Sequence, residues 1–130
     1  MSKKIGEVAA LLNVSIDTLR YYEKIDLLGQ VPRSDSGVRH YDEALIARIR
    51  FIRHAQRMGF SLEAIKDLLV FRDQPSNVKP QVREMIKQKL VDLDQQIQDL
   101  SQLRDELQAL TTACEGSSDN DCPILKEFEK

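Results

Sequence analysis

Two cysteines near the end of the chain, Cys114 and Cys122, are the side chains best suited to chemistry. Seven residues separate them, including a glycine and two serines, so this segment can bend and bring both sulfur atoms together. Thiolates are soft ligands that select soft ions such as Cu(I), and two thiolates suffice for a linear site. Zn(II) usually takes a tetrahedral set of ligands, and neither His40 nor His54 lies near the thiols in the sequence. The spacing therefore favours a soft monovalent ion.

Other chemistries for this pair stay open at the level of sequence. Asp119 and Asp121 lie between the thiols and can add oxygen ligands for a harder, divalent ion. The thiols can also act as a redox or electrophile sensor, through oxidation or alkylation. A dithiol enzyme is disfavoured because there is no Cys-x-x-Cys pair on a strand–helix unit and no evident catalytic base, so we expect no enzyme. Lacking an apolar run of signal-peptide or membrane length, the chain is expected to be cytoplasmic, with reduced thiols and no membrane partner.

A long amphipathic helix precedes the cysteines and must position them. Its apolar residues recur in steps of three and four between residues 82 and 110, at Ile86, Leu90, Leu93, Ile97, Leu100, Leu103, Leu107 and Leu110. Such a narrow stripe, on a helix about 40 Å long without glycine or proline, is typical of a coiled-coil seam. The remaining segments are too short to cover it, so we expect the same helix of a second chain to pair with it. An intramolecular hairpin or bundle is the alternative.

The N-terminal part of the chain carries an excess of positive charge. Residues 1–60 contain ten Lys/Arg against seven Asp/Glu, and residues 61–130 contain nine against fourteen, which gives the net charge of −2. Two short helices, at residues 4–12 and 16–24, are joined by a turn in which Ser15 can cap the second helix. This arrangement predicts a helix-turn-helix, whose second helix enters the major groove of DNA.

The second of these helices carries the candidate DNA contacts. Leu19 is expected to face inward, with four residues available outside: Asp17, Thr18, Arg20 and Tyr22. Arg20 can contact a phosphate or a guanine edge, while Ser15 and Thr18 can reach phosphates. A solvated helix face with an aromatic pair in the core is the alternative.

A hairpin and two more helices complete the predicted head. Residues 31–41 contain two extended runs around a turn at Gly37, and Arg33 and Arg39 flank the turn as expected for a wing along a phosphate backbone. An exposed hairpin without a role in DNA binding is the less expected alternative. Asp42 should cap a third helix that ends at Gly59, with a basic surface formed by Arg48, Arg50, Arg53 and Arg57. Ser61 should cap a fourth helix, and the prolines of residues 73–80 predict a hinge. We therefore expect a DNA-binding head at 1–72, the hinge at 73–80, a dimerisation helix at 81–112 and a cysteine loop with a short terminal helix at 113–130.

Four motifs in this order resemble the MerR family of bacterial transcription regulators: Ile5-Gly6-Glu7-Val8-Ala9, Thr18-Leu19-Arg20-Tyr21-Tyr22-Glu23, Gly37-Val38-Arg39-His40-Tyr41 and Met58-Gly59-Phe60-Ser61-Leu62. The resemblance covers essentially the whole chain. It implies a mainly α-helical fold, with a winged helix-turn-helix head and a homodimer through an antiparallel coiled coil of the long helices. It also implies action with RNA polymerase at promoters whose spacer is overlong, by distorting double-stranded DNA. The DNA contacts carried over from the family are Ser15, Thr18, Arg20, Tyr22, Arg33, Arg39 and Tyr41.

The cysteine spacing is similar to that of the copper-efflux regulators of this family, a CueR-like subgroup that senses Cu(I), Ag(I) or Au(I). Relatives for divalent ions place a third cysteine near the start of the long helix, where this chain has Lys79. The resemblance thus implies a two-thiolate site for a monovalent ion, with Lys79 or Arg83 neutralising its net negative charge. A coiled-coil interaction module without a DNA role is the distant alternative.

Overall fold

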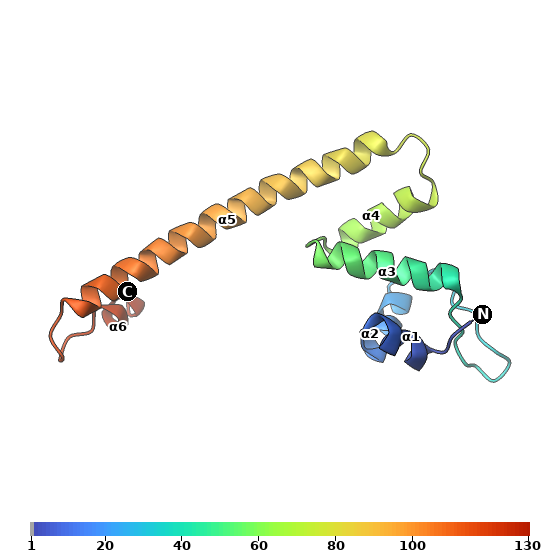
Figure 1. Ribbon diagram of the computed structural model, residues 1–130, viewed down its shortest axis with the longest axis horizontal. Helices are drawn as coiled ribbons and strands as arrows, with labels where there is room; N and C mark the ends of the chain where they lie inside the picture. The colour runs from blue at the N-terminus through green and yellow to red at the C-terminus, as the bar shows by residue number, and fades with distance from the viewer. Residues whose placement is uncertain (1) are drawn as a thin grey trace. The chain divides into compact units, whose positions relative to one another are not determined.

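The computed structural model describes residues 2–130, which form six α-helices (Figure 1). The helices are α1 (Ile5–Leu12), α2 (Ile16–Lys24), α3 (Glu43–Arg57), α4 (Leu62–Asp73), α5 (Lys79–Glu115) and α6 (Pro123–Phe128). Among these residues, β-structure is limited to two isolated bridges, Lys3 with Tyr41 and Arg33 with Arg39. The fold is therefore mainly α-helical, as the sequence predicts. The chain divides into two compact units, unit 1 up to Val82 and unit 2 from Arg83 onward.

The helix ends of unit 1 follow local chemistry that can be read from the sequence. Three helices begin after a side-chain oxygen that accepts the backbone N–H three residues later: Ser15 for α2 (3.0 Å), Asp42 for α3 (2.8 Å) and Ser61 for α4 (3.1 Å). Asn13 ends α1 in the left-handed conformation, and Gly59 follows α3 with a φ of 92°. The caps at Ser15, Asp42 and Ser61 confirm the predicted starts of α2, α3 and α4.

The core of unit 1 draws buried side chains from α1 to α4 and from the segment between α2 and α3. Its largest fully buried members include Leu19 and Tyr22 of α2, Ile49 and Ile52 of α3, and Tyr41. Burying each such side chain is worth about 1.5–3 kcal/mol. Because α2 and Tyr41 share this core, the second helix of the helix-turn-helix and the base of the hairpin are held in one rigid block.

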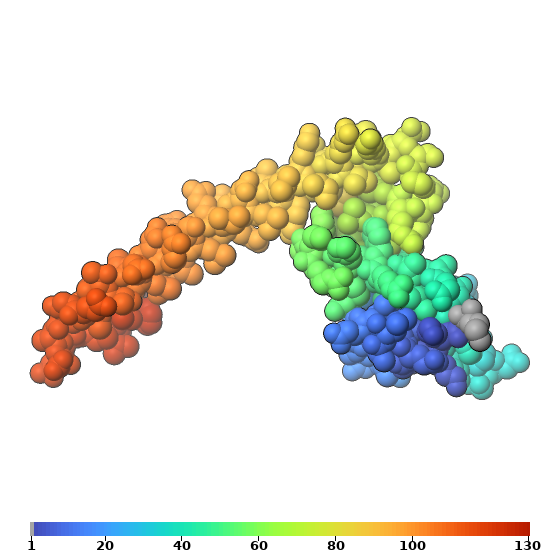
Figure 2. All heavy atoms as spheres, viewed as in Figure 1, coloured from blue at the N-terminus to red at the C-terminus, as the bar shows by residue number. Residues whose placement is uncertain are grey.

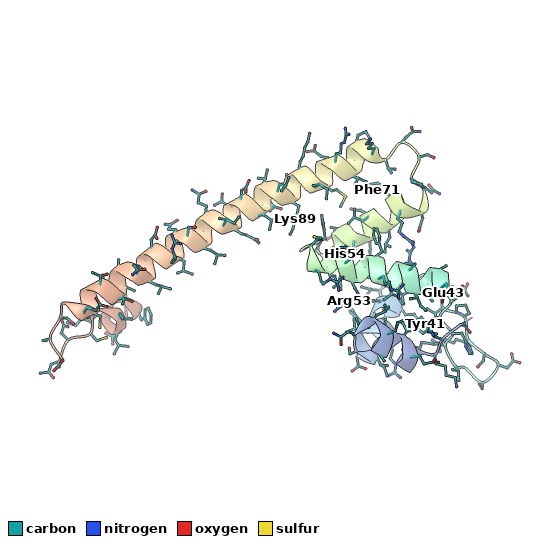
Figure 3. All side chains as sticks on the ribbon, viewed as in Figure 1. Tyr41, Glu43, Arg53, His54, Phe71 and Lys89 are labelled. Carbon is teal, nitrogen blue, oxygen red and sulfur yellow. The ribbon has the colours of Figure 1, made fainter. Side chains whose placement is uncertain are left out.

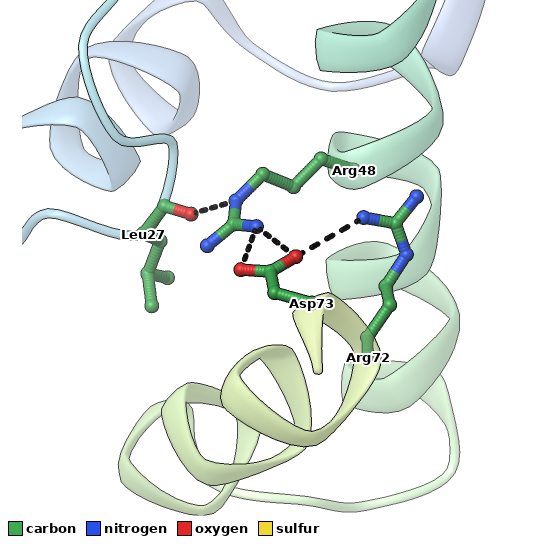
Figure 4. A network of polar contacts seen from close by, with 4 residues as sticks. All are labelled: Leu27, Arg48, Arg72 and Asp73. Atoms are coloured by element: carbon green, nitrogen blue, oxygen red, sulfur yellow. Dashed lines mark hydrogen bonds and ion pairs between the residues drawn. The ribbon is translucent and has the colours of Figure 1, made fainter. Parts of the chain in front are cut away.

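Arg48 of α3 joins three parts of unit 1 (Figure 4). Its Nε donates to the carbonyl oxygen of Leu27 at 2.6 Å, and its Nη1 donates to both carboxylate oxygens of Asp73 at 3.0 and 3.1 Å. Arg72 adds a longer ion pair to Asp73 at 3.8 Å. The prediction that Arg48 contributes to an exposed basic surface is therefore wrong, because its guanidinium ties the end of α4 to the segment after α2.

In unit 2, none of the residues of α5 is buried. The predicted stripe is exposed from Ile86 to Leu107, with values from 38% at Leu93 to 65% at Leu100, and its last member, Leu110, is half-buried. The helix is longer than the predicted 81–112 at both ends, so Lys79 and Cys114 are helical residues. A continuous apolar face of this kind is unusual on a monomer and indicates a surface that another protein element covers.

None of the described helices combines the length and apolar character needed to span a membrane.

Candidate DNA interface and metal site

The start of α2 presents a small polar surface. Ser15 Oγ accepts the Thr18 N–H and lies 2.7 Å from the Thr18 hydroxyl oxygen, so the two side chains form a pair at the helix N-terminus. One turn on, Arg20 is exposed and makes a 3.8 Å ion pair with Asp17, whose side chain is 94% exposed. Such an exposed pair is weak, so Arg20 can exchange Asp17 for a phosphate. The helix N-terminus itself also favours an anion.

The two tyrosines predicted to face DNA are core residues. Tyr22 is buried and its hydroxyl donates to Gln56 Oε1, while Tyr41 is fully buried, and among the described residues its hydroxyl has no hydrogen-bond partner. In Figure 3 Tyr41 lies inside unit 1, near the start of α3. The prediction that Tyr22 is available outside is wrong because it lies three residues after Leu19 and so shares the inward face of α2. The neighbouring Tyr21 is 50% exposed instead, and the same spacing could have identified it.

The hairpin between α2 and α3 is closed by backbone hydrogen bonds around its turn. Ser34 donates to the carbonyl of Val38 at 2.8 Å, and Gly37 donates to the carbonyl of Ser34 at 2.9 Å. Gly37 has a φ of 86°, which requires a residue without Cβ constraints and confirms the predicted turn. The tip projects from the rest of unit 1 (Figure 2). Arg33 and Arg39 lie directly opposite each other in the antiparallel bridge, so their side chains emerge side by side.

Both hairpin arginines are paired with one acid of α2. Arg39 Nε lies 2.6 Å from Glu23 Oε1, and Arg33 Nη2 lies 3.4 Å from Glu23 Oε2. Burial of the Glu23 carboxylate raises its pKa, but the hydrogen bonds and charges of Arg39 and Arg33 together outweigh burial and lower the pKa below its ordinary value of 4.5. The nearby Tyr41 hydroxyl has a raised pKa, first because it is buried and then because Glu23 is negative. Glu23 is therefore ionised at neutral pH.

The two cysteines lie at the two ends of one short loop. Cys114 is in the last turn of α5, and Cys122 is the residue just before α6. Ser117 joins the loop ends, because its hydroxyl lies 2.7 Å from the Cys114 carbonyl oxygen and 3.0 Å from the Asp121 carbonyl oxygen. Asp121 also forms an ion pair with Lys126 of α6. Both cysteines are free thiols and half-buried.

The loop offers two thiols as candidate metal ligands. Within the part of the chain that the structure describes, no group of three or more His, Cys, Asp and Glu side chains is placed to hold a metal. Asp121 is engaged by Lys126, which leaves it less available as a ligand. A trigonal or tetrahedral ion would therefore need a ligand from outside this loop, whereas a linear ion would not.

Comparisons with known proteins agree with the arrangement of the helices. Residues 3–70 match the MerR HTH family of regulatory proteins, and residues 46–110 match the MerR DNA-binding family. The chain belongs to the MerR family. It is 36% identical over 130 residues to the HTH-type transcriptional regulator ZntR of Escherichia coli K12, covering 98% of this chain and 92% of ZntR. A probable heavy metal-dependent transcriptional regulator of Haemophilus influenzae is 37% identical, covering 93% of this chain and 94% of that protein.

Among solved structures, the lead(II) complex of the transcription regulator PbrR691 from Ralstonia metallidurans CH34 matches with a TM-score of 0.84. The identity is 28%, and the match covers 97% of this chain and 98% of that one. Members of the MerR family are DNA-binding transcription regulators, so the chain is a regulator and not an enzyme. The relatives named above include a heavy metal-dependent regulator and a lead(II)-bound regulator.

The structure brings together some of the predicted site residues and separates others. Arg33 and Arg39 lie opposite each other on the hairpin, and Cys114 and Cys122 stand at the two ends of one loop. Lys79 begins α5, at the opposite end of that helix from Cys114. Glu23, which joins the hairpin to α2, was missed as a site residue, because its partners are remote in sequence.

Proposed function

We propose that this MerR-family chain is a homodimeric, metal-responsive transcription regulator that activates when a soft monovalent ion, Cu(I), Ag(I) or Au(I), binds Cys114 and Cys122. It would occupy an overlong-spacer promoter in the cytoplasm, with RNA polymerase, and activate by distorting the DNA. The observation that carries the proposal is a head of the MerR family on the same chain as two free thiols at the two ends of one loop, whose ends the Ser117 hydroxyl joins through the carbonyl oxygens of Cys114 and Asp121.

The proposed DNA surface comprises exposed and half-buried donors of α2 and of the hairpin. Ser15, Thr18 and Arg20 line the first turns of α2, and Arg33 and Arg39 extend the positive surface to the hairpin. Side chains of these types contact mainly phosphates and so position the protein on the duplex. Tyr22 and Tyr41 act in this proposal through the core, where they hold α2 and the hairpin base in place.

The exposed stripe of α5 supports dimerisation. Seven large apolar side chains with the spacing of a coiled-coil seam are each more than a third exposed, namely Ile86, Leu90, Leu93, Ile97, Leu100, Leu103 and Leu107. Pairing with the same helix of a second copy would bury these seven side chains on both helices in one symmetric contact. If the pair is antiparallel, the start of one α5 lies near the end of the other, so Lys79 and Arg83 of one chain could neutralise the thiolate site of its partner.

A divalent heavy metal is the second candidate inducer, favoured by the heavy metal-dependent relative and the lead(II) complex described above. The two thiolates would then need a further ligand from outside their loop. In the proposed dimer Lys79 stands where such a ligand would be useful, so Lys79→Cys should extend the response to Cd(II) or Hg(II). A thiol redox or electrophile signal is the remaining alternative.

One experiment separates these candidates. The reduced protein is titrated with Cu(I), Ag(I), Zn(II) and Cd(II), with metal stoichiometry read by native mass spectrometry and activation read by transcription from an overlong-spacer promoter. We expect one monovalent ion per cysteine pair, activation by Cu(I) or Ag(I), and loss of both in Cys114→Ser and in Cys122→Ser, with DNA affinity retained. Strongest activation by Zn(II) or Cd(II) would favour the divalent site, and activation by an oxidant without metal would favour the redox sensor.

A further inference from the structure

We propose that Glu23 is a positioning residue for DNA binding, whose single carboxylate fixes both hairpin arginines to α2 in the orientation that meets the phosphate backbone. This inference rests on the proposed DNA surface and adds to it an acid that does not itself touch DNA. Glu23 is negative and lies beside a surface that must attract a polyanion. Glu23 can therefore favour DNA binding only by holding the two arginine side chains in place, and not through its charge.

The geometry supports a fixed and directional contact. The Arg39–Glu23 pair is short, and the two side chains are only 24% and 19% exposed, so solvent screens the pair weakly. The bond uses Nε of Arg39, which leaves both terminal nitrogens of the guanidinium for a phosphate. Arg33, which is 47% exposed, uses only Nη2 and keeps its other donors. Glu23 thus occupies one edge of each guanidinium and leaves another edge free.

Both partners of Glu23 sit on a hairpin that has a single bridge between its arms and a projecting tip. At its base the hairpin is held by the reciprocal backbone hydrogen bonds between Tyr41 and Lys3, both 2.8 Å long. Glu23 supplies a second attachment further out, from the helix that also carries Arg20. Because arginine side chains lose much rotational freedom on binding, fixing two of them beforehand lowers that loss.

Removing the Glu23 carboxylate removes both its negative charge and its attachment to the two arginines. These two losses should change the affinity for DNA in opposite directions, so the proposal can be tested. Losing a negative charge near the duplex should tighten binding if charge alone matters. Losing the attachment should weaken binding if Glu23 orders the arginines. Asp17 is the matched control, since it is an acid of the same helix, is 94% exposed and pairs only loosely with Arg20.

The test compares Glu23→Ala and Asp17→Ala in the full-length protein. The probe is a labelled duplex that the purified wild-type protein enriches from a random-sequence pool, and the dissociation constant is measured over a range of salt concentrations. We expect Glu23→Ala to bind DNA about tenfold more weakly, and the slope of its log affinity against log salt concentration to be smaller by about one, as for the loss of one phosphate contact. We expect Asp17→Ala to bind DNA more tightly. Tighter binding by both variants would overturn the proposal.

A third variant covers the case in which Glu23→Ala fails to fold, as judged by its helical circular dichroism. Arg39→Lys keeps the positive charge and leaves Glu23 in place, but lacks the planar fork that contacts Glu23 and a phosphate together. We expect Arg39→Lys to bind about tenfold more weakly than the wild type, because it breaks the same contact. Wild-type affinity in Arg39→Lys would overturn the proposal. Failure of the wild-type protein to enrich any duplex would instead overturn the proposed DNA-binding function, and this inference with it.

Discussion

Replacing Arg48 by methionine should destabilise unit 1 strongly, although an arginine in a helix rich in basic residues looks dispensable in the sequence. The substitution keeps most of the aliphatic packing of the side chain and removes only its polar end. The Leu27 carbonyl then loses its 2.6 Å hydrogen bond within a residue that is nearly fully buried. The Asp73 carboxylate loses its two bonds from Nη1 at the same time.

The size of the effect follows from these contacts. A hydrogen bond between a charged group and a buried carbonyl is worth about 1.5–3 kcal/mol. The pair with Asp73 adds no more than about 1 kcal/mol, because that carboxylate is 50% exposed and solvent screens it. We therefore expect a loss of about 2–4 kcal/mol, or a fall of about 1–2 M in the urea midpoint for a typical slope.

The assay is urea unfolding followed by circular dichroism, at a fixed protein concentration that keeps the association state constant. Arg50→Met is the matched control, since Arg50 is an exposed arginine of the same helix and such surface changes usually stay within about 0.5 kcal/mol. If Arg48→Met and Arg50→Met unfold at the same urea concentration, the joining role assigned to Arg48 is refuted.

Three further predictions concern the association surface, the cysteine loop and the acid range. Ile97→Asp should abolish self-association in sedimentation equilibrium because it would bury an unpaired charge in the apolar stripe of α5. Gln95→Asp, on the opposite face of α5, should leave self-association intact. Equal dimer affinities of the two variants would contradict the assignment of this stripe as the dimer contact. Ser117→Ala should weaken binding of Ag(I) several-fold in a competition titration by freeing the loop ends, whereas Ser118→Ala should not, and identical affinities would argue against a role for the Ser117 hydroxyl. Because the pKa of Glu23 is lowered in the folded chain, its ionised form stabilises unit 1 fully above about pH 4.5, and this contribution is lost as the pH falls through the folded pKa. The urea midpoint should thus fall more steeply on acidification in the wild type than in Glu23→Gln, and parallel curves would speak against this linkage.

Helix positions and caps in unit 1 were predictable because they depend on neighbours within one turn of sequence. The caps at Ser15, Asp42 and Ser61 and the turn at Gly37 are local signals, and each is present in the structure. The error at Tyr22 was avoidable, since its spacing from Leu19 places it on the buried face. The joining roles of Glu23 and Arg48 were not predictable in this way. Their partners lie 10 to 25 residues away and approach only once the chain has folded.

In unit 2 the pattern predicted the long helix and its apolar face, but placed the end of the helix too early. Glycine and serine residues after Cys114 indicated a loop, yet helix α5 continues through Cys114 to Glu115 before the turn begins. The last helical residue of such a helix depends on the weak helix preferences of a few neighbouring residues, so the sequence predicts it only to within one or two positions. The consequence matters for the site, because a thiol on a helix is held in a narrower range of directions than a thiol on a loop.

The two thiols therefore differ in how freely they can meet an ion. Cys114 is fixed by the last turn of a long helix, while Cys122 stands in an extended conformation just before α6, next to Asp121, whose carbonyl oxygen contacts the Ser117 hydroxyl. Binding of one ion by both sulfurs would stiffen the loop between them and so change the freedom of α6, whose exposed Leu125 and Phe128 have no place in the core of unit 1. A linear two-thiolate ion can do this within one chain. A trigonal ion would need a third ligand from outside the loop, so the number of ligands determines whether the signal is confined to the loop or reaches another part of the protein.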